Sequence, residues 1–101
     1  MKVVFNAASK RDLRRAIKYY ADTSLKRADA LRAQVKEVVQ TITRRRGGDH
    51  VGPHGLPCRR CTPFPYPVYY YIEGETLFIL GLVHERRHPD YLRRDPKDRT
   101  E

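Results

Sequence analysis

Side chains that can bind an anion, or exchange a proton with one, gather on both sides of an aromatic stretch in the last third of the chain. These residues are Arg59 and Arg60 before the stretch and His84, Arg86, Arg87 and Tyr91 after it. A guanidinium offers two parallel N–H donors to phosphate or carboxylate oxygens. An imidazole, whose ordinary pKa is about 6.5, can give or take a proton near neutral pH. The pattern therefore predicts a cationic site for an anionic partner.

Two kinds of chemistry fit this set of residues. A metal-independent ribonuclease needs a base for the 2′-hydroxyl, cations for the charged transition state and an acid for the leaving oxygen. His84 could be the acid or the base, while Arg86 and Arg87 could hold the phosphate. Tyr91 could stack on a base or donate a proton. In the alternative, the arginines dock on carboxylates of a protein partner, and only one arginine of each adjacent pair can face a given site on a strand.

A further basic cluster, formed by Arg44, Arg45 and Arg46, closes the second of two predicted helices. Cations are favourable there because the carboxyl end of a helix carries partial negative charge. Helix capping is one explanation of the cluster. The other is binding to nucleic-acid phosphates, which would make the affinity depend on salt.

Metal-ligating residue types occur at His50, His54, Cys58 and Cys61, with spacings that a tetrahedral zinc site can use. On a strand, however, Cys58 and Cys61 point to opposite faces. The flanking arginines also disfavour a dication. We therefore expect two ordinary thiols, no bound metal and no cofactor.

The clearest element that could position these residues is a β-hairpin. Residues 67–72 and 76–83 are β-branched and aromatic runs, which fit a pleated sheet. Between them, Glu73, Gly74 and Glu75 predict a tight turn in which the glycine takes a positive φ. Three further elements are expected: a first strand at 3–5, a third strand at about 56–62 and a last helical turn at 89–94.

The first half of the chain predicts two antiparallel helices joined by a short connection. In the first helix, Leu13, Ile17 and Tyr20 recur at helical spacing, with Ser9 as the expected N-cap and Asp12 in the first turn. The apolar stripe of the second helix follows a break at residues 22–24 and consists of Ala28, Leu31, Val35, Val38 and Ile42.

The predicted order is β-α-α-β-β-β, an α+β fold in which an N-terminal helical hairpin packs on one face of an antiparallel sheet. A chain of 101 residues is long enough for one domain. We place this domain at residues 1–94 and a polar tail at 95–101.

The net charge of +9 predicts an anionic partner, such as nucleic acid or an acidic protein segment. No apolar run approaches the roughly 20 residues that span a bilayer. The N-terminus also lacks the apolar segment and cleavage site of a signal peptide. We expect a cytoplasmic protein that does not bind membranes and whose cysteines are reduced.

The order of elements, together with the runs FPYPVYYYIEG from Phe64 and ILGLVHERRHP from Ile79, resembles the RelE/ParE superfamily of toxins. These proteins are the toxin halves of bacterial type II toxin–antitoxin modules. The resemblance covers most of the chain and implies two different activities. ParE-like members bind DNA gyrase and block replication, whereas RelE-like members are ribosome-dependent endoribonucleases that cut mRNA.

Two features favour the ParE-like alternative. Residues 47–71 contain no lysine, whereas RelE carries lysines in the corresponding segment, and the His-x-x-Arg-x-Pro ending also resembles ParE. The resemblance further implies a cognate antitoxin that covers the sheet and the grooves beside the helical hairpin. The target is then DNA gyrase, or the ribosome with mRNA in the RelE-like case, and the aromatic hairpin could form a homodimer.

Overall fold

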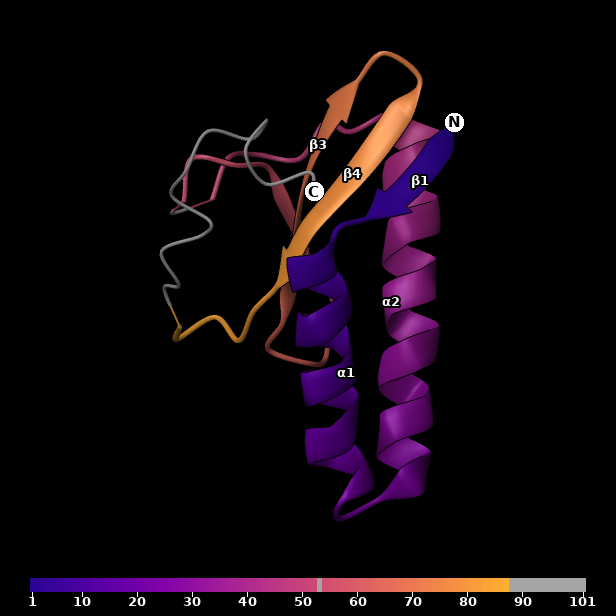
Figure 1. Cartoon of the computed structure of the whole chain (residues 1–101), viewed down its shortest axis with the longest axis vertical. Helices are drawn as coiled ribbons and strands as arrows, with labels where there is room; N and C mark the ends of the chain where they lie inside the picture. The colour runs from indigo at the N-terminus through magenta and orange to yellow at the C-terminus, as the bar shows by residue number, and fades with distance from the viewer. Residues whose placement is uncertain (53, 88–101) are drawn as a thin grey trace.

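The computed structural model describes residues 1–52 and 54–87. A two-helix hairpin lies against one face of a four-stranded sheet and extends well beyond it (Figure 1). The elements in chain order are β1 (Lys2–Phe5), α1 (Ala7–Ala21), α2 (Leu25–Arg45), β2 (Cys58–Arg60), β3 (Pro67–Glu73) and β4 (Thr76–Leu82). This arrangement confirms the predicted α+β class and the order of elements. The predicted turn at 89–94, the end of the predicted domain and the tail at 95–101 lie outside the described residues.

The sheet is mixed rather than wholly antiparallel, which corrects one detail of the prediction. Its strand order is β1-β4-β3-β2. β2, β3 and β4 pair antiparallel, but β1 pairs parallel with β4, with Lys2 opposite Thr76 and Phe5 opposite Ile79. Because each element after β1 and α1 reverses the direction of the chain, β4 runs in the same direction as β1 (Figure 1).

The predicted hairpin is confirmed, and its turn has the expected geometry. Gly74 has a φ of 59°, a conformation that glycine adopts without steric cost. The predicted third strand is shorter than expected and covers only Cys58–Arg60. Pro57 precedes it, and the chain turns back at Cys61, where the Phe64 N–H donates to the Cys61 carbonyl.

α1 begins three residues earlier than predicted, because Asn6 and not Ser9 is its N-cap. The Asn6 side chain accepts a hydrogen bond from the Ser9 N–H at 2.8 Å, and the Ser9 hydroxyl donates back to the Asn6 carbonyl at 2.9 Å. Asp12 consequently lies beyond the first turn. Its buried carboxylate accepts a hydrogen bond from the Leu82 N–H at 3.1 Å and so ties α1 to the end of β4.

α2 carries the predicted apolar stripe, and all five of its residues are buried. Ser24 caps the helix at its start, since its hydroxyl accepts from the Arg27 N–H. Arg46 is the C-cap that follows the helix, and it takes a left-handed conformation with a φ of 55°. Two arginines in the last turn face the negative end of the helix dipole, as the capping explanation of this cluster requires. No helix among the described residues is long and apolar enough to cross a membrane.

The two faces of the sheet bury separate apolar clusters. The cluster under the helices includes Leu31, Ile42 and Tyr70, and the smaller cluster on the opposite face includes Tyr69 and Leu80. Cys61 lies in the first cluster and Cys58 packs against the second. The two thiols are therefore on opposite faces, as predicted, and both are free.

The two cysteines are expected to differ sharply in reactivity. Cys61 is fully buried, and burial raises the pKa of its thiol from 9.0 to about 12. Burial also raises the pKa of Cys58, which is only partly buried. A thiol-specific chromogenic reagent at mildly alkaline pH should modify Cys58 slowly and Cys61 only on unfolding, since the thiolate is the reactive form.

Cys58→Ser is the matched control for this measurement, because the folded variant should then show no reactive thiol. Two thiols reacting at equal rates in the folded protein would contradict the prediction. The raised pKa of Cys61 also has a consequence for stability. Above pH 9 the unfolded chain loses this proton before the folded chain does, so the free energy of unfolding should fall as the pH rises toward 12.

Candidate functional site

The two arginines before the hairpin are both paired with carboxylates and face different surroundings. Arg59 is partly buried, and its Nη1 donates to Asp49 Oδ1 at 2.8 Å. The Tyr70 hydroxyl donates to the other Asp49 oxygen at 2.6 Å. The side chain of Arg60, which is half exposed, lies 3.5 Å from Glu85. Arg59 is thus part of a network that fastens the loop after α2 to the sheet.

The residues after β4 form a tight turn around His84. The Arg87 N–H donates to the His84 carbonyl at 2.8 Å, and the Arg86 N–H donates to His84 Nδ1 at 3.1 Å. Since Nδ1 accepts a hydrogen bond, the proton of the neutral imidazole is on Nε2. The His84 ring also meets the Tyr66 ring edge to face, with the ring centroids 5.5 Å apart.

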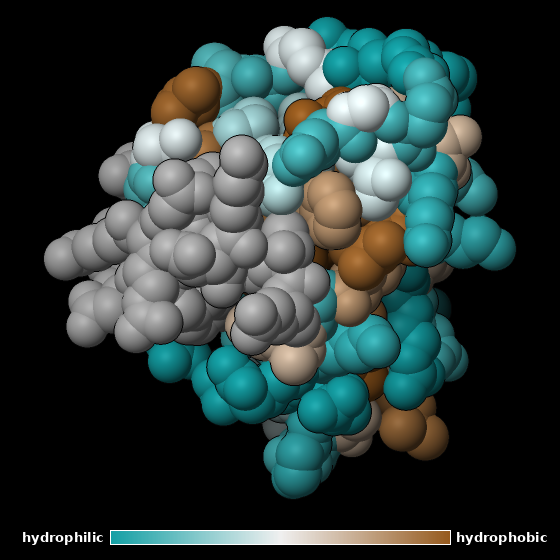
Figure 2. Space-filling view, turned by 45° about the horizontal axis from the view of Figure 1, so that its top comes forward, coloured by the Kyte–Doolittle hydropathy of each residue, from teal (hydrophilic) through white to brown (hydrophobic). Residues whose placement is uncertain are grey.

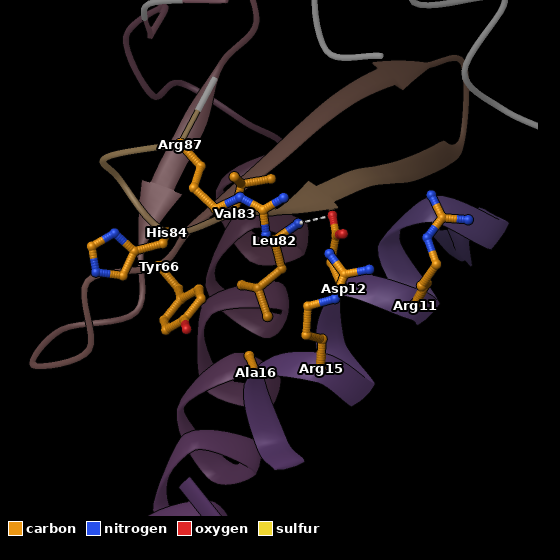
Figure 3. Close-up of a pocket in the computed structure, with 9 residues that line it drawn as sticks. All are labelled: Arg11, Asp12, Arg15, Ala16, Tyr66, Leu82, Val83, His84 and Arg87. Carbon is orange, nitrogen blue, oxygen red and sulfur yellow. Dashed lines mark hydrogen bonds between the residues drawn. The ribbon is translucent and has the colours of Figure 1, made fainter. Parts of the chain in front are cut away.

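A polar cavity of about 140 Å³ opens where α1 meets the end of β4. We call it the cationic cavity. Arg87 and His84 line it from the turn after β4, while Arg11 and Arg15 line it from α1. Figure 3 shows the side chains of Arg15 and Arg87 converging on it from the two sides, with Arg11 nearer the start of α1 and pointing away from them. Arg86, which also follows β4, is exposed and does not line it.

The base of the cationic cavity is held by Asp12. The hydrogen bond from the Leu82 N–H to its carboxylate is drawn in Figure 3. Among the described residues, no carboxylate forms an ion pair with Arg11, Arg15 or Arg87. The cavity therefore presents guanidinium groups to solvent without a neutralising ion pair from that part of the chain.

The other predicted binding residues lie elsewhere. Arg46 pairs with Glu75 at 2.5 Å, next to the hairpin turn and therefore at the opposite end of β4 from His84. Arg44 donates to Thr41 within its own helix. Tyr91 lies outside the described residues. The structure thus brings His84 and Arg87 together but separates them from the arginines at positions 44–46.

Sequence reasoning missed the part of the site that α1 supplies. Arg11, Arg15 and Tyr19 are four residues apart, so they lie on one stripe of the helix. Leu13 and Ile17 form a different stripe. The regular spacing of the two arginines ahead of an exposed tyrosine was the available signal, but the spacing alone does not reveal which strand end the stripe faces.

A second hollow, which we call the apolar groove, lies between α1, α2 and β1. Five apolar residues line it: Phe5, Leu13, Ile17, Val35 and Val39. Arg32, Lys36 and Gln40 from α2 complete the lining. On the face that Figure 2 shows, hydrophilic residues predominate and surround a small group of hydrophobic ones. The apolar groove has the composition of a docking site for an apolar stripe with acidic neighbours.

Comparison with known proteins gives the following matches. A family model described as the ParE toxin of the type II toxin–antitoxin system parDE matches residues 3–89. A structure titled "Chromosomal ParDE TA system from P. aeruginosa" superimposes with a TM-score of 0.70 at 15% sequence identity. The match covers 83% of this chain and 95% of that chain. No curated protein sequence matches the chain.

Proposed function

Because this chain belongs to the ParE toxin family of type II toxin–antitoxin systems, we propose that it inhibits DNA gyrase and is neutralised by a cognate antitoxin. The observation that carries the proposal is the family match, which extends from β1 past the turn after β4. The fold supports it, since the same helical hairpin and sheet recur in the ParDE structure.

The apolar groove is the proposed docking site of the antitoxin. Its apolar side chains come from both helices and from β1, so a partner segment that fills it would contact three elements at once. Lys36 at its rim is exposed, and so is Arg32, which already pairs with Asp29. An amphipathic helix with an apolar stripe and flanking carboxylates matches this lining.

The cationic cavity supports a binding role better than nuclease chemistry. A ribonuclease needs a proton acceptor and a proton donor at the same phosphate. Of the described lining residues, His84 can supply one such group. The Asp12 carboxylate accepts the Leu82 N–H, and burial raises the pKa of the Tyr66 hydroxyl, so at neutral pH Tyr66 can donate a proton but not accept one. The three guanidinium groups that line the cavity, in contrast, are suited to binding an anion.

Pulse-labelling after induction of the chain alone in bacteria tests the proposed target. DNA synthesis should fall within minutes, while protein synthesis continues. A first fall in protein synthesis would contradict gyrase inhibition and favour the RelE-like alternative.

His84→Ala separates the same two activities by a different route. Because no single acid or base is needed for docking, growth inhibition by this variant should stay within about threefold of the original. Ala33→Ser, a change on the exposed face of α2, is the control for expression. Loss of inhibition in His84→Ala with normal antitoxin binding would indicate catalysis instead.

A further inference from the structure

The cationic cavity continues into a larger hollow of different character. The larger hollow, which we call the aromatic hollow, has a volume of about 500 Å³. It shares four lining residues with the cationic cavity: Arg15, Tyr66, His84 and Arg87. Its other lining residues are Tyr19, Tyr20 and Pro65. A small compartment lined by guanidinium groups thus lies beside a large one lined by aromatic rings.

We propose that the two compartments together form a binding site for a nucleotide unit, with its phosphate in the cationic cavity and its base in the aromatic hollow. The unit can come from a free nucleotide or from a single-stranded nucleic acid. The inference does not rest on gyrase inhibition or on antitoxin binding.

The charges of the cationic cavity favour a phosphate over a carboxylate. Arg11, Arg15 and Arg87 can each donate two parallel hydrogen bonds, and a carboxylate has only two oxygens to accept them. A phosphate offers more acceptor oxygens and more charge. Asp12 also lines this cavity, where its carboxylate accepts the Leu82 N–H at the cavity base.

The rings of the aromatic hollow are placed to contact a base. Tyr19 is 67% exposed, so most of its ring is open to a ligand. The Tyr20 ring, in contrast, is covered by the Arg27 guanidinium, 5.3 Å from its centroid. Tyr66 and His84 stand edge to face at the border of the two compartments. Base–aromatic stacking next to a cationic track is typical of sites for single-stranded nucleic acid.

The arginines of the cationic cavity come from two distant parts of the chain, so the cavity forms only when the chain is folded. Arg11 and Arg15 come from α1, whereas Arg87 follows β4, more than seventy residues later in the chain. The hydrogen bond between Asp12 and Leu82 holds these two parts together. Arg15 and Arg87 therefore converge because of the tertiary structure and not because the sequence is uniformly basic, and Arg11 lies beside them on the same stripe of α1 as Arg15.

The test compares two triple variants that remove equal charge. The first variant, called the cavity triple, removes the three positive charges that arginines contribute to the cationic cavity: Arg11→Gln/Arg15→Gln/Arg87→Gln. The second, called the surface triple, removes three exposed charges that do not line it: Lys10→Gln/Arg14→Gln/Lys26→Gln. Fluorescence anisotropy of a short labelled oligothymidylate is measured for each folded variant in about 50 mM salt, where phosphate contacts are strong. The cavity triple should weaken binding about tenfold or more, and the surface triple less than about threefold.

Two further probes identify the source of the nucleotide and test the base compartment. Direct binding of adenosine monophosphate that the cavity triple loses would assign the site to free nucleotides, and binding of the oligonucleotide alone would assign it to a strand. Tyr19→Ala should weaken binding of either nucleotide probe severalfold while leaving competition by inorganic phosphate unchanged. Equal weakening by both triples, or no binding of any probe to the original chain, would overturn the proposal.

Discussion

Val39→Glu is expected to weaken antitoxin binding by about a hundredfold or more, because it places a charge in the apolar groove where we propose the antitoxin docks. Val39 is partly exposed on α2, so the carboxylate remains hydrated in the free toxin and the fold should survive. On binding, that carboxylate would be buried against Leu13, Ile17 and Phe5, and pairing with Lys36 at the rim would take this lysine from the antitoxin. The measurement is calorimetric titration with the cognate antitoxin, supported by co-purification of the two proteins.

Ala33→Glu is the matched control for this experiment. It adds the same charge to the same helix at an exposed position that does not line the groove. The control variant should bind the antitoxin within about threefold of the original. If Val39→Glu and Ala33→Glu bind equally well while both remain folded, the antitoxin docks elsewhere.

Asp49→Ala should lower the free energy of unfolding by about 2–4 kcal/mol, the largest stability effect that we expect from a single polar residue. The Asp49 side chain is only 11% exposed and accepts hydrogen bonds from both Arg59 and Tyr70. Its removal leaves the hydroxyl of the fully buried Tyr70 without this acceptor. Arg59 is 33% exposed, so solvent offsets part of its loss, and the estimate is set below the full cost of breaking a buried pair. Unfolding by urea gives the value.

Two related variants separate the contributions in this network. Tyr70→Phe removes one hydrogen bond and should cost about 1 kcal/mol, while Asp49→Asn keeps an acceptor and should cost less than Asp49→Ala. In the double variant Asp49→Ala/Tyr70→Phe the losses should not add, because both changes break the same bond. Additive losses, or an Asp49→Ala effect below about 0.5 kcal/mol, would show that the network does not hold the loop.

The network also predicts that the free energy of unfolding depends on pH. Burial, and next to it the bond to Asp49, raises the pKa of Tyr70 above its ordinary value of 10.0. Above pH 10 the unfolded chain therefore loses this proton before the folded chain does. The free energy of unfolding should fall as the pH rises through this range, and Tyr70→Phe should reduce the fall.

The parts of the fold with a strong local pattern were predictable from the sequence. The stripe on α2 reports burial directly, because residues that share a helix face recur at the helical period. β3 and β4 were recognisable as continuous β-branched and aromatic runs, which fit strands that are buried on both faces. The parallel partner of β1 was not predictable in this way. A four-residue apolar strand fits several positions at a sheet edge, and its direction depends on the path of the whole chain between β1 and β4.

The site was predictable only where its residues follow the hairpin. His84 and Arg87 were identified from residue type and position, and the structure brings them together. Arg59 was identified by the same criteria, but its guanidinium forms an ion pair with Asp49 from the preceding loop. Arg11 and Arg15 were missed, since a solvated helix face and a site-forming helix face have the same composition.

The pairing of β1 with β4 has a consequence for the order of events during synthesis. Residues 2–5 leave the ribosome early, but their partner strand at 76–82 is among the last described segments to be made. The pairing of β1 with β4 holds Phe5 in the lining of the apolar groove. The hydrogen bond from the Leu82 N–H to Asp12 likewise joins residues that are 70 positions apart. Contacts this far apart in sequence form late, because the intervening chain must first be closed into a loop. The β1 side of the apolar groove is therefore incomplete until residues 76–82 have been made, so an antitoxin that docks there, as we propose, would not bind shorter nascent chains.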